Sequence, residues 1–119
     1  MDLIPAMVWY KDAHNRILRA NRRAAASIKK TVAEIEGRST DEFYPEEAER
    51  YHQDDLEVIV SGRPKLGIIE PYQTGDGEKR WVQTDKVPYL DPQGNVLGVL
   101  VFAQDITERK RTEEALRES

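Results

Sequence analysis

The run from Val99 to Ala103 is apolar at every position, and it constrains the fold more than any other stretch of the sequence. Successive side chains of a β-strand point to opposite faces of the sheet, so this strand is apolar on both faces. Such a strand must be covered from both sides. We therefore predict a strand over Val96 to Ile106, with helices on one face of its sheet and another covering contact on the other.

Four shorter runs supply the strands that would pair with it. Ala6 to Lys11 is apolar and aromatic, and turn residues separate it from Arg16 to Ala20, as in a β-hairpin. Leu66 to Tyr72 and Arg80 to Tyr89 are strand-like and are joined by the turn-forming sequence Thr74 to Gly77. The order of these runs predicts an antiparallel five-stranded sheet.

Helices are predicted between the two groups of strands and at the C-terminus. Asn21 is a suitable N-cap for a helix over Arg22 to Lys30. Pro45 to Ser61 carries a helical apolar stripe and is the longest predicted helix. The mostly charged tail from Glu108 to Ser119 is marginal as a helix alone, so we expect it to begin a longer one. The predicted fold class is α+β, with short helices and one longer helix on one face of the sheet and a C-terminal linker helix.

The composition excludes several functions. The 119 residues fit one domain and contain no cysteine, which excludes disulfides, thiolate catalysis and cysteinyl–flavin photochemistry. With 18 basic and 22 acidic residues, the chain has no overall basic field for nucleic acid. No apolar run approaches the roughly 20 residues of a membrane helix, and no secretory signal is recognised. We expect a cytoplasmic location, which includes the cytosolic part of a larger membrane-tethered protein.

Several short motifs occur in the order typical of one protein family. They include Asn21 at the start of the first helix, the join at Gly37 and the Asp54-Asp55 pair of the long helix. The C-terminal motifs are the most specific: Arg80-Trp81, Lys86-Val87-Pro88-Tyr89, Asp91, Gly94, Gly98 and Asp105-Ile106-Thr107-Glu108-Arg109-Lys110. With these motifs the chain resembles the PAS domain family, the sensor modules of bacterial signalling proteins, over about residues 3 to 119.

The resemblance implies a sensor domain over residues 1–107 and the start of a signalling coiled-coil helix at 108–119. Such a module couples ligand binding or dimer rearrangement to a covalently linked effector, which we predict to be a histidine kinase. A diguanylate cyclase is the alternative effector, and a ligand-free module for homodimerisation or protein interaction is the alternative role. The segment carries no catalytic constellation, so we predict no enzyme activity for it.

The resemblance also implies a ligand pocket between the long helix and the sheet. Its predicted lining, chosen by element and strand parity, is Phe43, Leu56, Ile59, Ile68, Trp81, Val99 and Val101. Strand parity that is wrong by one residue would exchange the inward and outward side chains.

His52 is the candidate cofactor ligand, since haem-binding relatives use a histidine on the long helix. The alternative is a partly buried histidine held by Asp55, three residues further on. A noncovalent flavin is a second candidate, because four aromatic residues could line a planar site or simply belong to the core: Tyr51, Tyr72, Trp81 and Phe102. We predict neither haem nor flavin. We also predict no metal site, because His14 is the other histidine and is expected in a turn. A small organic ligand is left open.

Two further sets of residues are expected to act outside the pocket. Asp105 and Glu108 have the spacing of a capping box, with Thr107 as an alternative cap, so this junction is predicted to relay strand movement to the tail helix. A homodimer is predicted through the outer sheet face and the tail, with candidate residues Trp9, Leu100, Phe102 and Leu116. Nucleic-acid and membrane contacts are not expected.

Overall fold

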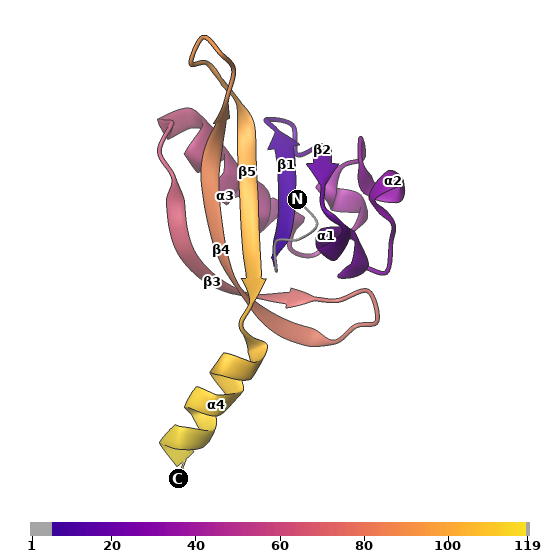
Figure 1. The fold of residues 1–119 in the computed structure, drawn as a ribbon, viewed down its shortest axis with the longest axis vertical. Coiled ribbons are helices and arrows are strands. Elements are labelled where there is room, and N and C mark those ends of the chain that lie inside the picture. The colour runs from indigo at the N-terminus through magenta and orange to yellow at the C-terminus, as the bar shows by residue number, and fades with distance from the viewer. Residues whose placement is uncertain (1–5, 119) are drawn as a thin grey trace.

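The computed structural model describes residues 6–118, which form one sheet with helices against it (Figure 1). In chain order the elements are β1 (Met7–Asp12), β2 (Ile17–Ala20), α1 (Arg22–Ala26), α2 (Val32–Ile35), the 3-10 helix η1 (Thr40–Glu42), α3 (Ala48–Ser61), β3 (Lys65–Gln73), β4 (Lys79–Leu90), β5 (Val96–Asp105) and α4 (Thr107–Glu118). This order agrees with the sequence-based prediction.

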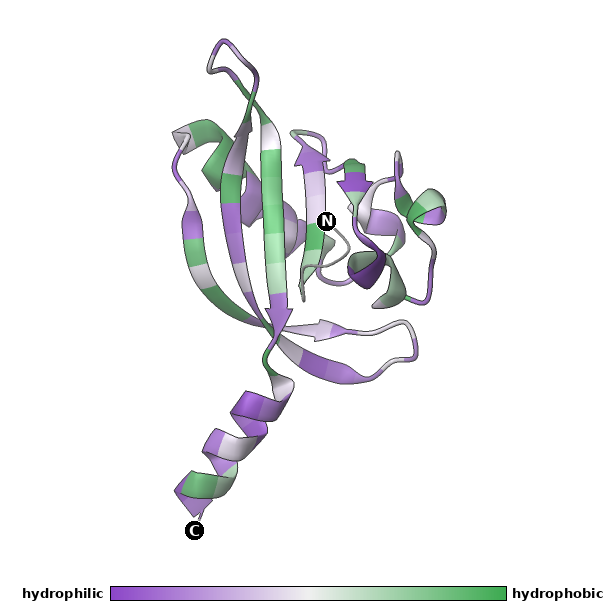
Figure 2. Ribbon diagram, viewed as in Figure 1, coloured by the Kyte–Doolittle hydropathy of each residue, from purple (hydrophilic) through white to green (hydrophobic). Residues whose placement is uncertain are grey.

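The sheet has the strand order β2-β1-β5-β4-β3, and all neighbouring strands are antiparallel. The predicted α+β class and five-stranded antiparallel sheet are confirmed. β5 lies at the centre, which explains why Val99 to Ala103 is apolar throughout. In the hydropathy colouring of Figure 2, β5 is green along most of its length, whereas α4 is largely purple and extends away from the sheet.

The helices α1, α2 and α3 lie on the side of the sheet that we call the inner face. One buried cluster joins β1, β2 and the short helices and includes Met7, Ile17, Ala24 and Ile35. A second cluster joins α3 to β5 through Val58, Val99 and Val101. α3 therefore closes over the middle of the sheet.

Asn21 fixes the passage from the first hairpin into α1. Its side-chain oxygen accepts hydrogen bonds from the backbone N–H groups of Ala24 and Val8, at 2.9 and 3.1 Å. Its amide donates to the carbonyl of Ala6 at 2.7 Å. The predicted N-cap is thus present, and the same side chain also binds β1.

Two helix boundaries differ from the prediction. α1 ends at Ala26 rather than at Lys30, because Ser27 is the C-cap and Lys29 has a φ of 60°, outside the right-handed helical region. α3 begins at Ala48 rather than at Pro45, and Glu47 at its N-cap makes no side-chain hydrogen bond. Gly62, with a φ of 68°, ends α3 as predicted.

Two aromatic residues lie on the opposite face from the one expected. Trp9 pairs with Val101 and shares its inner face, so its prediction as an outer dimer residue is wrong in placement. Trp81 alternates with the inner residues Val82 and Thr84 and lies on the outer face, not in the pocket. The reason is that a charged residue points inward on each strand, Lys11 on β1 and Lys86 on β4. A rule that places charged side chains on the outer face therefore assigns the two faces of these strands the wrong way round.

Candidate functional site

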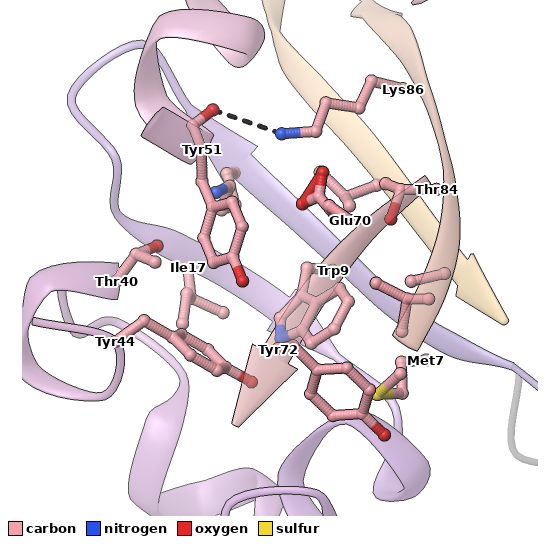
Figure 3. A pocket seen from close by; sticks show the side chains of 14 residues that line it. Met7, Trp9, Ile17, Thr40, Tyr44, Tyr51, Glu70, Tyr72, Thr84 and Lys86 are labelled. Atoms are coloured by element: carbon pink, nitrogen blue, oxygen red, sulfur yellow. Dashed lines mark hydrogen bonds between the residues drawn. The ribbon is translucent and has the colours of Figure 1, made fainter. Parts of the chain in front are cut away.

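A cavity of about 50 Å³ lies between the inner face of the sheet and the segment that leads into α3. Aromatic side chains form much of its wall: Trp9 from β1, Tyr44, Tyr51 from α3 and Tyr72 from β3 (Figure 3). Aliphatic groups of Met7, Ile17, Val82, Val101 and Ala103 complete the apolar part. A dry apolar cavity of about 150 Å³ can hold benzene, so this one accepts a ring only if a wall side chain moves.

Two buried lysines meet one buried aspartate beside the cavity. Asp55 of α3 is 1% exposed, and its two oxygens lie 2.6 Å from Lys11 Nζ and 2.7 Å from Lys86 Nζ. Lys86 Nζ also donates to the carbonyl of Tyr51 at 3.1 Å, and Lys11 Nζ to Asn15 Oδ1 at 3.3 Å. Burial lowers the pKa of Lys11, and the neighbouring Asp55 opposes that effect. This group fixes α3 to β1 and β4.

Glu70 of β3 is a second buried acid in the cavity wall, and it is 7% exposed. No other residue of the 6–118 segment forms a hydrogen bond or ion pair with its carboxyl group. Burial raises the pKa of Glu70, against the lowering effect of the nearby Lys86 and Arg50 charges.

Tyr72 connects the cavity wall with the end of the sheet. Its hydroxyl donates a hydrogen bond of 2.6 Å to Asp105 Oδ2, which also lies 2.6 Å from Arg80 Nε. Burial raises the pKa of Tyr72, and its bond to Asp105 raises it further. The pKa of Asp105 is well below its usual range: burial opposes ionisation, but bonds from Arg80, Tyr72 and Thr107 outweigh it.

The start of α4 is held by Asp105 and by β4. Asp105 Oδ1 accepts from the N–H of Thr107 at 2.9 Å. The Thr107 hydroxyl accepts from the N–H of Trp81 at 2.9 Å, and Lys110 Nζ lies 4.4 Å from the centre of the Trp81 ring. These contacts differ from the predicted capping box, because α4 begins at Thr107 and the Glu108 side chain is exposed.

Of the predicted pocket residues, Val101 lies in the cavity wall. The structure places the others around the cavity rather than in it. Ile59 and Val99 pack in the adjacent apolar cluster, and Phe43 packs against the main core. Ile68 and Leu56 are half-buried and do not reach the cavity. Ile68 pairs with Thr84 across β3 and β4.

His52 is half-buried on α3 and does not line the cavity. Its buried Nδ1 has no hydrogen-bond partner within the described residues, and Asp55 binds the two lysines instead of the imidazole. The expected His52–Asp55 contact is therefore wrong. In residues 6–118, no three histidine, aspartate or glutamate side chains gather as metal ligands would.

The outer sheet face carries Leu100 and Phe102, both half-buried, while Leu116 is exposed on α4. Tyr10 and Tyr89 stack edge to face on this side, with ring centroids 5.4 Å apart. Trp9 does not contribute to this surface. None of the helices in the described segment is long and apolar enough to cross a bilayer.

The sequence matches the family described as PAS fold over residues 1–111. The chain belongs to the PAS fold family. The PAS domain is 29% identical to the aerobic respiration control sensor protein ArcB of Escherichia coli K12 over an alignment of 117 residues. This alignment covers 98% of the PAS domain but 15% of ArcB. The chain thus spans a small part of the curated relatives that it matches.

Solved structures agree with this assignment. The Vibrio cholera VqmA–ligand–DNA complex superposes with a TM-score of 0.82 at 25% identity, covering 89% of the PAS domain and 48% of the VqmA chain. A PAS domain from Colwellia psychrerythraea superposes with a TM-score of 0.75 at 17% identity, covering 90% of this chain and 91% of that one. The second likeness shows the fold alone. PAS domains are sensory modules, and this chain is one by family.

Proposed function

We propose that the PAS domain binds a small organic molecule in the cavity beneath α3 and passes its occupancy to α4 through Tyr72 and Asp105. One observation carries the proposal: Tyr72 lines the cavity and at the same time donates a 2.6 Å hydrogen bond to Asp105. A ligand that displaces the Tyr72 ring would break or lengthen this bond. Asp105 holds the first amide of α4, so the helix would respond.

The effector at the far end of α4 is proposed to be a histidine kinase in a cytoplasmic two-component system. The similarity to the sensor ArcB supports this assignment, although it covers 15% of that protein. A diguanylate cyclase is the alternative effector. The similarity to VqmA, solved with a ligand, supports small-molecule binding. The division into a sensor over residues 1–107 and a signalling helix from 108 is part of the same proposal.

Filling the cavity from the protein side should imitate a ligand. Ala103 lies in the cavity wall, and a flexible methionine there would occupy the empty volume. In Ala103→Met we expect the amides of Thr107 and Lys110 to exchange with deuterium about 3- to 10-fold faster, since one charge-assisted hydrogen bond is worth about 1 kcal/mol or more. Hydrogen exchange resolved to single residues measures this.

Tyr72→Phe tests the route of the effect. It removes the hydroxyl that binds Asp105, so it should speed exchange at the same two amides without filling the cavity. In the double variant the two effects should not add, because they break the same bond. Unchanged exchange in Ala103→Met, or full additivity in the double variant, would contradict the proposed relay.

A ligand-free homodimerisation module is the second candidate function, favoured by the outer sheet face. Leu100 and Phe102 of β5 lie beside the stacked Tyr10–Tyr89 pair on this face. We expect the chain to sediment as a dimer at micromolar concentration. Leu100→Asp should raise the dimer dissociation constant at least about tenfold, because a charge would be buried in the contact.

The matched control is Leu97→Asp, on the same strand at a position that is 47% exposed and of inner-face parity. It should leave the dissociation constant within about twofold of the wild type, as expected for a surface substitution. A wild-type chain that sediments as a 13.7 kDa monomer under these conditions would remove the dimer hypothesis.

A further inference from the structure

The buried ion-pair group beside the cavity carries more positive than negative charge. Two ammonium groups, those of Lys11 and Lys86, share the carboxylate of Asp55 at 2.6 and 2.7 Å. The side chains of the lysines are 6% and 2% exposed, and that of Asp55 is 1% exposed. A buried charge without a counter-charge is strongly unfavourable, so this group is stabilised by any second acid that can ionise close to it.

Glu70 of β3 is an acid in the right place. It is 7% exposed and lines the same cavity as Lys11 and Lys86. Figure 3 shows the side chains of Glu70 and Lys86 both pointing toward Tyr51 of α3. In the structure Glu70 nevertheless stands apart, because its carboxyl group forms no ion pair or hydrogen bond with another residue of 6–118. Such an environment suits the protonated form of a carboxyl group.

Lys86 has a hydrogen-bond donor to spare for this acid. An ammonium group carries three N–H donors. Lys86 Nζ donates to Asp55 Oδ1 at 2.7 Å and to the carbonyl of Tyr51 at 3.1 Å, and these are its two hydrogen bonds within the described segment. Both acceptors belong to α3, whereas Glu70 belongs to β3. A third bond from Lys86 to Glu70 would therefore join β3 to α3 through one ammonium group.

We propose that Glu70 makes the PAS domain responsive to pH: when it loses its proton, its carboxylate pairs with Lys86 and draws β3 toward α3. While Glu70 keeps the proton, it stands apart from Lys86, as in the structure. The proton passes to water, and the negative charge that forms cancels the excess positive charge of the ion-pair group. The proton is thus an input to the domain that is independent of the organic ligand proposed above.

The surroundings of Glu70 determine the pH at which this happens. Charged groups face it from three elements of the described segment: Lys86 of β4, Lys11 of β1, and Arg50, Asp54 and Asp55 of α3. Burial raises the pKa of Glu70 and outweighs the lowering effect of Lys86 and Arg50. The Tyr51 hydroxyl also faces Glu70, but burial raises the pKa of Tyr51 and keeps it neutral. Glu70 should therefore release its proton above the ordinary glutamate value of about 4.3.

The test follows the carboxyl carbon of Glu70 in the full 119-residue chain by NMR. Between about pH 4 and about pH 8 its chemical shift should titrate with a midpoint above about 4.3. The backbone amides of Tyr51 and Asp55 should shift with the same midpoint, because Lys86 binds both residues. In Glu70→Gln, which cannot ionise, these amide shifts should disappear. A midpoint at or below about 4.3, or amide shifts that persist in Glu70→Gln, would overturn the proposal.

His52 is the control for the α3 shifts, since it lies on the same helix and histidines change charge near neutral pH. His52→Gln should leave the titration of the Tyr51 and Asp55 amides in place. Loss of their titration in His52→Gln would assign it to the imidazole and refute a switch at Glu70.

Lys86→Met tests the partner of Glu70. The variant should fold, because Lys11 still pairs with Asp55, and it should move the Glu70 midpoint to higher pH, since a cation that favours the carboxylate is gone. The matched control is Lys79→Met, at an exposed position of the same strand, which should leave the midpoint unchanged. An unshifted midpoint in a folded Lys86→Met chain, as judged by its NMR spectrum, would show that Lys86 is not the partner.

Urea denaturation gives a second readout that is free of any relay to α4. A carboxyl group whose pKa is raised on folding stabilises the fold below its unfolded pKa, and this contribution is lost as pH rises through the folded pKa. The urea midpoint of the wild type should therefore equal that of Glu70→Gln near about pH 4 and fall below it near about pH 8. Equal midpoints at both pH values would contradict the proposal.

Discussion

Replacing Asp55 by alanine is expected to lower the free energy of unfolding by about 3–5 kcal/mol. The carboxylate lies between two lysines that are 6% and 2% exposed, at 2.6 and 2.7 Å, so its removal leaves two buried ammonium groups without an anion. A typical domain has only about 5–15 kcal/mol of stability, so much of the chain could unfold at room temperature. Urea denaturation followed by circular dichroism measures the change.

The matched control is Asp54→Ala, one residue earlier on α3. Asp54 pairs with Lys65 at 2.7 Å, but both side chains are partly exposed, and such pairs contribute about 1 kcal/mol or less. A loss of less than about 1.5 kcal/mol in Asp55→Ala would show that the two lysines lose their charge or reach solvent at little cost.

A triple variant distinguishes the worth of the ion pairs from the cost of breaking them. Lys11→Met, Asp55→Leu and Lys86→Met together replace all three charges by apolar groups of comparable size. Such replacements are often neutral or stabilising, so this variant should be at least as stable as the wild type if it packs well. In that case the three charges do not stabilise the fold, and their role lies in the cavity that Lys11 and Lys86 line.

The same buried charges explain where the sequence-based prediction of the site was wrong. The elements and the sheet could be predicted because β5 is apolar throughout and because Asn21 and Gly62 mark helix ends. Strand faces are normally assigned by placing apolar residues inside and charged ones outside. Lys11 on β1 and Lys86 on β4 point inward, so that rule exchanged Trp9 and Trp81 between the two faces.

The polar part of the cavity left a weaker signal in the sequence. Asp55 interrupts the apolar stripe of α3 on its inner side, and such a residue needs a buried partner of opposite charge. Sequence alone cannot identify that partner, because Lys11 and Lys86 lie 44 and 31 positions away and meet Asp55 only across the folded sheet. Glu70 forms no hydrogen bond or ion pair with another residue of 6–118, so no pairing rule could have placed it in the cavity.

The junction between β5 and α4 could be located from the Asp105-Ile106-Thr107 sequence, but its contacts could not be derived. Helix-capping rules assign Asp105 and Thr107 to the first turn of α4. In the structure Thr107 binds the backbone of β4 and Asp105 binds Tyr72 and Arg80, both distant in sequence. The junction therefore couples three strands to the helix, which is more than a cap.

Asp105→Ala should accordingly cost more than the roughly 1 kcal/mol of a helix cap. It removes charge-assisted bonds from Arg80 and Tyr72 as well as the bond from the Thr107 amide, and allowing for its partial exposure we expect a loss of about 2 kcal/mol. The fold should survive, because this is well below a typical domain stability. The amides of Thr107 and Lys110 should exchange at least tenfold faster.

The pH dependence of this loss follows from the pKa of Asp105, which is lower in the folded chain than in the unfolded one. A carboxylate with a lowered folded pKa stabilises the fold fully above its unfolded pKa of about 3.9, and that contribution disappears as pH falls. The stability difference between wild type and Asp105→Ala should thus be constant near pH 7 and shrink below about pH 4. Asp91→Ala, in the β4–β5 turn, is the control and should leave exchange in α4 unchanged.

The effect of Asp105→Ala should also appear in the parent protein. A shift of about 1.4 kcal/mol changes a two-state population tenfold, so Asp105→Ala in the parent protein should alter the basal output of the effector. Normal regulation there, together with normal exchange at Thr107, would show that the junction only begins a helix and would favour the homodimerisation module.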